Sequence, residues 1–127
     1  MNKIKLYHFS DYNIKNKISV KFYGLNSYTA NDLKATNIKR AFYYIDNIPL
    51  EYRFKNSKYC YVIEVDKNNL YDLRIDKNNY INKYKNIPEI LKAIKRDYIG
   101  IIYNSGIDIV NLFYDIKINK RLTLTKS

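Results

Sequence analysis

The sequence predicts an α+β fold: one compact domain with a central, mostly antiparallel sheet and a few helices. Its 127 residues fit a single domain, and a hydrophobic fraction of 46% can build a sizeable core. Apolar residues alternate with other residues at 4–10 and 58–66, which is typical of strands. Strands and helices do not alternate regularly along the chain, and this favours α+β over a doubly wound parallel sheet.

The pattern of apolar residues, turn residues and caps places the elements in order. They are a strand at 4–10, an extended stretch at 18–24, a helix from Thr29 to near Asp46, a loop at 46–57, a strand at 58–66, a strand or extended segment at 70–75, helices beginning at Asp76 and Pro88, and strands at 99–104 and 106–118. Thr29 and Asp32 resemble a capping box, and apolar residues follow at helical spacing. The domain is expected to cover 1–118, with a basic, frayed tail at 119–127.

The chain is strongly basic, with 23 Lys and Arg against 12 Asp and Glu and a net charge of +11. Such a charge attracts polyanions, which include nucleic acid and acidic protein faces. A second explanation is nucleotide composition, because Lys, Asn, Ile and Tyr all have AT-rich codons. That bias favours a low-GC bacterium or its phage as the source. Most of the basic residues are lysine, although arginine is the better reader of phosphates and bases.

Several classes of protein are disfavoured. Cys60 is the single cysteine, so no disulfide can form within the chain, and it lies in a strand pattern typical of a buried, inert thiol. Histidine and cysteine are too few for a zinc site, and no metal site is predicted. The sequence starts without the apolar region of a signal peptide, and no apolar stretch approaches the roughly 20 residues of a membrane span. A cytoplasmic protein is therefore expected.

His8 is the single histidine, and the alternating pattern places it within the first strand. An imidazole can donate and accept hydrogen bonds, and its pKa lies near physiological pH. Ser10 shares its face of the strand, so both side chains could line one cleft. The alternative is a structural histidine whose hydrogen bonds go to the backbone.

Two further candidates lie at the start of the predicted helix. Tyr28 could stack a planar ring, and Thr29 follows it; the alternative for Tyr28 is a core or rim tyrosine, since the chain has 15. Lys39 and Arg40 could contact phosphates, although a basic helix face is usually just solvated. No glycine-rich phosphate loop occurs, so strand edges and side chains would have to hold a nucleotide.

Acidic candidates lie in the last strands. Asp108 opens the final strand, where a carboxylate could bind a ribose hydroxyl or stabilise a developing cation. Asp115 lies further along, and Glu64 and Asp66 close an earlier strand. The alternative for Asp108 is an aspartate of the turn.

These motifs together resemble the small ADP-ribosyltransferase fold, in its histidine–tyrosine–glutamate branch. An early strand of that branch often reads Tyr-His-Gly-Ser, a second ends in a Tyr-Thr-like pair, and the domain closes with a Gly-Ile-Ile-Tyr strand and a Val-Val-Phe-Asp-like strand. The matching stretches are Tyr7 to Ser10, Tyr28-Thr29, Gly100 to Tyr103 and Val110 to Ile118.

The resemblance implies NAD⁺ as substrate and a transfer of ADP-ribose to a protein or nucleic acid. His8, Tyr28 and Asp108 would be the catalytic residues, with His8 on the ribose and Tyr28 stacked on the nicotinamide. His8, Phe9, Ser10, Tyr28, Thr29 and Arg40 would line the NAD⁺ site. The sequence departs from the family in two places: Phe9 replaces a glycine, and an aspartate stands where a glutamate is usual. A carboxylate displaced by about 1 Å can lower the rate by ~100-fold.

Three functions are therefore compatible with the sequence. The first is an ADP-ribosyltransferase-like protein, possibly phage-encoded, that modifies a host macromolecule. The second is a non-enzymatic basic protein that binds nucleic acid or inhibits a host defence protein. The third is an endoribonuclease-type toxin, whose residue types are present without a distinctive spacing. No membrane partner is expected for any of them.

Overall fold

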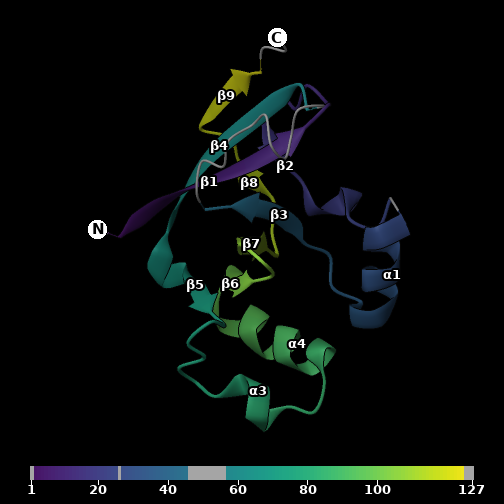
Figure 1. The fold of residues 1–127 in the computed structure, drawn as a ribbon, viewed down its shortest axis with the longest axis vertical. Helices are drawn as coiled ribbons and strands as arrows, with labels where there is room; N and C mark the ends of the chain where they lie inside the picture. The colour runs from purple at the N-terminus through teal and green to yellow at the C-terminus, as the bar shows by residue number, and fades with distance from the viewer. Residues whose placement is uncertain (1, 26, 46–56, 125–127) are drawn as a thin grey trace.

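A seven-stranded sheet runs through the molecule in the order β5-β6-β7-β3-β1-β4-β9 (Figure 1). The structure is a computed structural model that describes residues 2–25, 27–45 and 57–124. Neighbouring strands are antiparallel except β5 and β6, which are parallel. A second sheet is the short ribbon β2–β8. The prediction of an α+β domain with a mostly antiparallel sheet is confirmed.

The elements follow one another along the chain as follows. They are β1 (Lys3–Ser10), β2 (Lys17–Ile18), the 3₁₀ helix η1 (Val20–Phe22), α1 (Ser27–Thr36), β3 (Ala41–Tyr44), β4 (Tyr59–Asp66), η2 (Lys67–Asn69), β5 (Leu70–Asp72), α3 (Tyr80–Lys83), α4 (Ile87–Asp97), β6 (Gly100–Asn104), β7 (Asp108–Leu112), β8 (Ile116–Lys117) and β9 (Lys120–Thr123).

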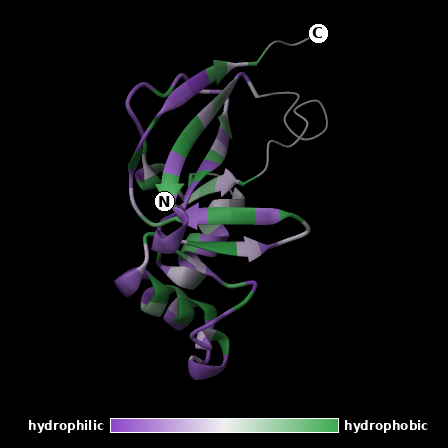
Figure 2. Ribbon diagram, turned by 90° about the vertical axis from the view of Figure 1, so that its left-hand side faces the viewer, coloured by the Kyte–Doolittle hydropathy of each residue, from purple (hydrophilic) through white to green (hydrophobic). Residues whose placement is uncertain are grey.

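The large sheet buries a different apolar cluster on each face, because successive strand residues point to opposite sides. One face carries Leu6, Tyr43, Ile63, Ile102 and Val110, and it is covered by the β2–β8 ribbon and the segments beside it. Hydrophobic and hydrophilic residues alternate visibly along its strands (Figure 2).

The second cluster lies on the opposite face, at the β5–β6–β7 end of the sheet. There α4 contributes Leu91 and Ile94, which pack with Tyr71, Ile101 and Phe113. Full burial of each such side chain contributes about 1.5–3 kcal/mol. Helices α3 and α4 lie at one end of the molecule, and β9 lies at the other (Figure 1).

Several predicted elements are confirmed. Helix α4 has Pro88 in its first turn and Asn86 as its N-cap, whose side chain accepts a hydrogen bond from the Glu89 N–H at 3.0 Å. Asp76 precedes α3 and accepts hydrogen bonds from the N–H groups of the first two helical residues. Gly106, with a φ of 84°, makes the turn between β6 and β7.

The predicted helix from Thr29 to near Asp46 is wrong in its second half. Helix α1 ends at Thr36, and Asn37 adopts a left-handed φ of 55°. Asparagine tolerates this conformation, which commonly terminates a helix. Residues 41–44 are instead the strand β3, between β1 and β7, with burial that alternates along the strand. The apolar spacing of this segment suits a helix. Its aromatic residues favour a strand, however, and it pairs with a strand on each side.

Two other predicted extended segments are shorter than expected. Of the stretch predicted at 18–24, only Ile18 is in a strand, the two-residue β2 that begins at Lys17, and η1 follows it. The segment 106–118 is divided into β7 and β8, because the chain leaves the large sheet after Leu112 to form the ribbon. The loop predicted at 46–57 lies outside the described residues, apart from its last residue.

The frayed tail predicted at 119–127 is wrong for residues 120–123. These residues form β9, which pairs antiparallel with β4 and forms an edge of the sheet. Their side chains are exposed, so the pattern of apolar residues gave no sign of a strand; backbone pairing alone defines it. Residues 125–127 lie outside the described part of the chain.

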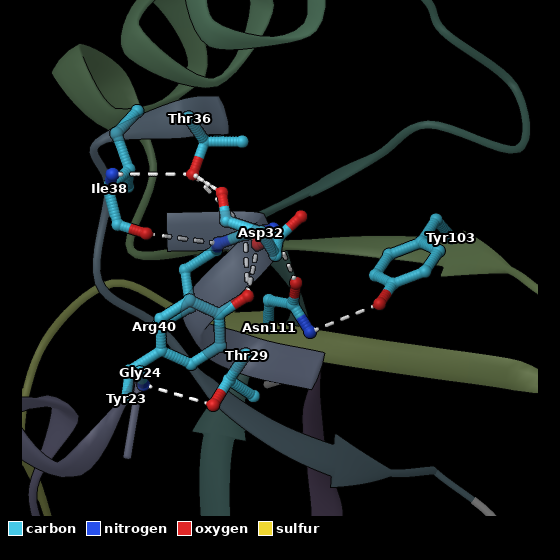
Figure 3. Close-up of polar contacts among 9 residues, drawn as sticks. All are labelled: Tyr23, Gly24, Thr29, Asp32, Thr36, Ile38, Arg40, Tyr103 and Asn111. Carbon is cyan, nitrogen blue, oxygen red and sulfur yellow. Dashed lines mark hydrogen bonds and ion pairs between the residues drawn. The ribbon is translucent and has the colours of Figure 1, made fainter. Parts of the chain in front are cut away.

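A buried arginine joins α1 to the sheet (Figure 3). Arg40 is 7% exposed and forms an ion pair with Asp32 of α1. Its guanidinium also donates to the Tyr23 hydroxyl and to the Asn111 side-chain oxygen of β7, both at 3.1 Å. Because a buried cation is stable only when acceptors surround it, these contacts fix the end of α1 against β3 and β7.

We predict that Arg40→Met lowers the free energy of unfolding by about 2–4 kcal/mol, because Asp32 loses its ion-pair partner and keeps only the Tyr23 hydroxyl as a described side-chain donor, while the Asn111 side-chain oxygen loses the guanidinium. Urea denaturation measures the change. Lys39→Met is the control, since Lys39 is the exposed neighbour, and a change within about 0.5 kcal/mol is expected there. Equal stability of Arg40→Met and the parent protein would contradict the role of Arg40.

Candidate functional site

His8 lies in β1, and its side chain contacts the neighbouring strand β3. Its Nδ1 is 2.7 Å from the carbonyl oxygen of Phe42, to which it donates, so the proton of the neutral ring is on Nδ1. The ring also lies against that of Tyr43, with centroids 5.4 Å apart. Burial lowers the pKa of His8 below its ordinary value, although the hydrogen bond to Phe42 opposes that shift. His8 is therefore neutral at physiological pH.

The two residues after His8 have contacts of their own. The Phe9 ring lies 6.0 Å from that of Tyr44, and strand alternation places both on the opposite face from His8. Ser10 accepts a hydrogen bond from the Tyr12 N–H at 3.1 Å, within the turn that follows β1.

The candidates near α1 lie on the other side of the sheet. Thr29 is buried and accepts a hydrogen bond from the Gly24 N–H at 3.0 Å. Arg40 contacts Asn111, which alternates with Val110 and so faces away from the cluster that contains Tyr43. Tyr28 is a residue of α1, and its side chain lies outside the described part of the structure.

Asp108 is at the start of β7 and forms an ion pair with Arg74 at 3.1 Å. Hydrogen bonding from the Asn104 amide, and then from Arg74, lowers the pKa of its carboxyl group. Strand β3 lies between β7 and β1, so Asp108 and His8 are not on neighbouring strands. The hydrogen bonds described for His8, Thr29 and Asp108 thus lead to three different sets of neighbours.

A basic hollow of about 440 Å³ lies at the β2–β8 ribbon, and the sequence did not predict it. Its lining residues are Lys15, Asn16, Lys17, Asp115, Ile116, Lys117 and Ile118. Lys17 and Lys117 stand directly opposite each other across the ribbon. The two segments are about 100 positions apart in the chain, and strands of two residues carry no periodic signal. The sequence signal was limited to a basic composition.

Three lysines and one carboxylate determine the charge of this hollow. Asp115 accepts a hydrogen bond from the Val20 N–H at 2.9 Å and pairs with Lys17 at 3.2 Å. The Val20 bond, more than Lys17, lowers the pKa of Asp115, so this residue is ionised at neutral pH. One negative charge cannot balance three lysines, and the hollow keeps a net positive charge.

Two of the four described arginines, Arg40 and Arg74, add little to the exposed basic surface, whereas Arg96 and Arg121 are exposed. Arg40 is buried, and Arg74 pairs with both Asp72 and Asp108. The cations of the hollow are all lysines, which act as point charges and lack the bidentate geometry that reads base edges.

Comparison with known proteins finds no matching family model, no similar curated protein and no similar solved structure. Within the residues that the structure describes, no three or more His, Cys, Asp and Glu side chains gather in a way that could hold a metal ion. The helices among these residues are all too short or too polar to cross a membrane.

We predict that His8 makes the stability of the protein depend on pH. Its pKa is lower in the folded state, so this contribution is complete above the unfolded value of about 6.5 and is lost as the pH falls below that value. Urea denaturation of the parent protein between pH 7.5 and 5.5 should show a loss of at most about 1.4 kcal/mol per pH unit. His8→Leu should have a flatter profile, and identical profiles would contradict the prediction.

Proposed function

We propose that the protein is a non-enzymatic nucleic-acid-binding protein whose basic hollow receives phosphate groups. The observation that carries the proposal is the direct opposition of Lys17 and Lys117 across the β2–β8 ribbon. Like charges in such positions destabilise a pair of strands. An anionic ligand bound between them would remove the repulsion, and Lys15 lines the same hollow.

Nucleic acid fits this site better than a small anion or a protein carboxylate. The hollow is open at the surface, and its lysines come from two separate segments, so a ligand with repeated negative charges can engage several of them. The net charge of +11 supplies long-range attraction toward a polyanion. Because lysine carries this recognition, binding should depend on salt and tolerate different sequences.

The NAD⁺-dependent transferase hypothesis stays a prediction of the sequence. The contacts of His8 with Phe42 and Tyr43 fit a structural histidine. A thermal-shift titration with NAD⁺, on the parent protein and on His8→Ala, would separate the two functions. Stabilisation that His8→Ala abolishes would favour the transferase and argue against a purely non-enzymatic protein.

We predict that Lys117→Gln weakens nucleic-acid binding and slightly stabilises the fold. Removal of one of two opposed lysines should raise the free energy of unfolding by about 0.2–1 kcal/mol. Loss of one phosphate contact should reduce the slope of log affinity against log salt by about 0.7–0.9. Fluorescence anisotropy with a labelled oligonucleotide, at several salt concentrations, measures the affinity, and urea denaturation measures the stability.

The control for this experiment is Lys77→Gln, the same chemical change at an exposed lysine just before α3. Lys77 does not line the hollow. It precedes α3, which lies at the opposite end of the molecule from β9 (Figure 1). The control should leave the salt slope unchanged. Equal losses in both variants would show that general charge, and not the hollow, attracts the oligonucleotide, and this would contradict the proposed site.

A further inference from the structure

We propose that the ligand is a single-stranded nucleic acid and that Tyr12 stacks one of its bases beside the basic hollow. This inference rests on the proposed function and adds the class of nucleic acid to it. Tyr12 belongs to the segment between β1 and β2, which also carries Lys15 and Lys17. The side chain of Tyr12 is 78% exposed, although tyrosine usually buries most of its ring.

The backbone on both sides of Tyr12 is held in place by the core. The hydroxyl of Tyr61, a fully buried residue of β4, donates to the Tyr12 carbonyl oxygen at 2.6 Å. The same hydroxyl accepts from the Ile14 N–H at 2.6 Å. The Tyr12 N–H donates to the Ser10 hydroxyl at 3.1 Å. Tyr12 therefore presents an exposed ring from an ordered turn, so little backbone entropy remains to be lost when a ligand binds.

Two basic residues lie close to the Tyr12 segment. Lys15 follows Tyr12 by three residues, a span of at most about 10 Å along the chain, and lines the hollow. The guanidinium of Arg121 in β9 donates to the side chain of Asn13, the residue after Tyr12, and lies 5.6 Å from the centre of the Tyr59 ring. Asp11 is the acidic residue of this segment, and it does not line the hollow.

An exposed aromatic ring beside a basic groove is the arrangement that binds single strands. Bases of a single strand are free to stack on a tyrosine, and each stacked base contributes about 1–3 kcal/mol. In a duplex the bases are already stacked, and extruding one costs a few kcal/mol. The strands of the β2–β8 ribbon have two residues each and span only about 7 Å, so the ribbon is too short to lie along a groove of the duplex.

The test compares Tyr12→Ala with the parent protein by fluorescence anisotropy. The probes are a labelled oligo(dT) of about 12 nucleotides and a duplex of the same length. Tyr12→Ala should weaken single-strand binding roughly 5- to 150-fold and leave duplex binding unchanged. Tyr12→Phe keeps the ring and should bind like the parent protein. Because the side chain is exposed, the melting temperature should not change.

Tyr114→Ala is the matched control: Tyr114 is 48% exposed and directly precedes Asp115 of the hollow, but it does not line the hollow and its ring lies 5.4 Å from the Lys95 ammonium of α4. It should leave both affinities unchanged. If Lys117→Gln weakens binding while Tyr12→Ala does not, the stacking role is overturned and the basic site stands. If the parent protein binds duplex as tightly as oligo(dT), the preference for single strands is overturned. If it binds neither probe, both proposals fail.

Discussion

The burial of Arg40 is the constraint on which the central part of the fold depends. A guanidinium that is 7% exposed requires acceptors within the protein, and it takes them from α1, from the Tyr23 segment and from β7. Asp32 can pair with Arg40 only if the helix stops and the chain turns back within a few residues. Asn37 makes that turn, and β3 then enters the sheet between β1 and β7.

The same constraint explains which parts of the fold the sequence could predict. The strands β1 and β4 alternate over eight residues each, and α4 has a clear cap, so local pattern and final structure agree. Residues 38–45 have apolar positions that suit either a helix or a strand. They form a strand because they pair with β1 and β7, and Arg40 contacts Asp32 and Asn111 beside that strand; no local pattern reveals these distant partners. The exposed strand β9 depends in the same way on a partner, the edge of β4.

The predicted site residues divide in the same way, into what a local pattern shows and what depends on distant partners. His8 lies in a strand, as the alternating pattern predicts, and its ring donates a hydrogen bond to the Phe42 carbonyl oxygen of the neighbouring strand. Thr29 and Arg40, two of the residues predicted to line a ligand site, are both buried in contacts that hold α1. In the sequence, nothing distinguishes the lysines of the hollow from the other lysines of this basic chain. Only the pairing of two very short strands brings them together, and that pairing follows from how the ribbon covers the core.

The core and the exposed surface are connected at Tyr61. Its ring is buried on the same face of the sheet as Leu6 and Tyr43, while its hydroxyl holds the backbone of Tyr12 and Ile14. The segment that carries Tyr12, Lys15 and Lys17 is therefore ordered by the core and does not need a ligand to become ordered. The exposed ring of Tyr12 adds little to the stability of the fold because it lies in water, and Lys117 stands opposite Lys17, whose ion-pair partner is Asp115. The proposed stacking uses this arrangement, in which the core holds the backbone of an exposed ring in place.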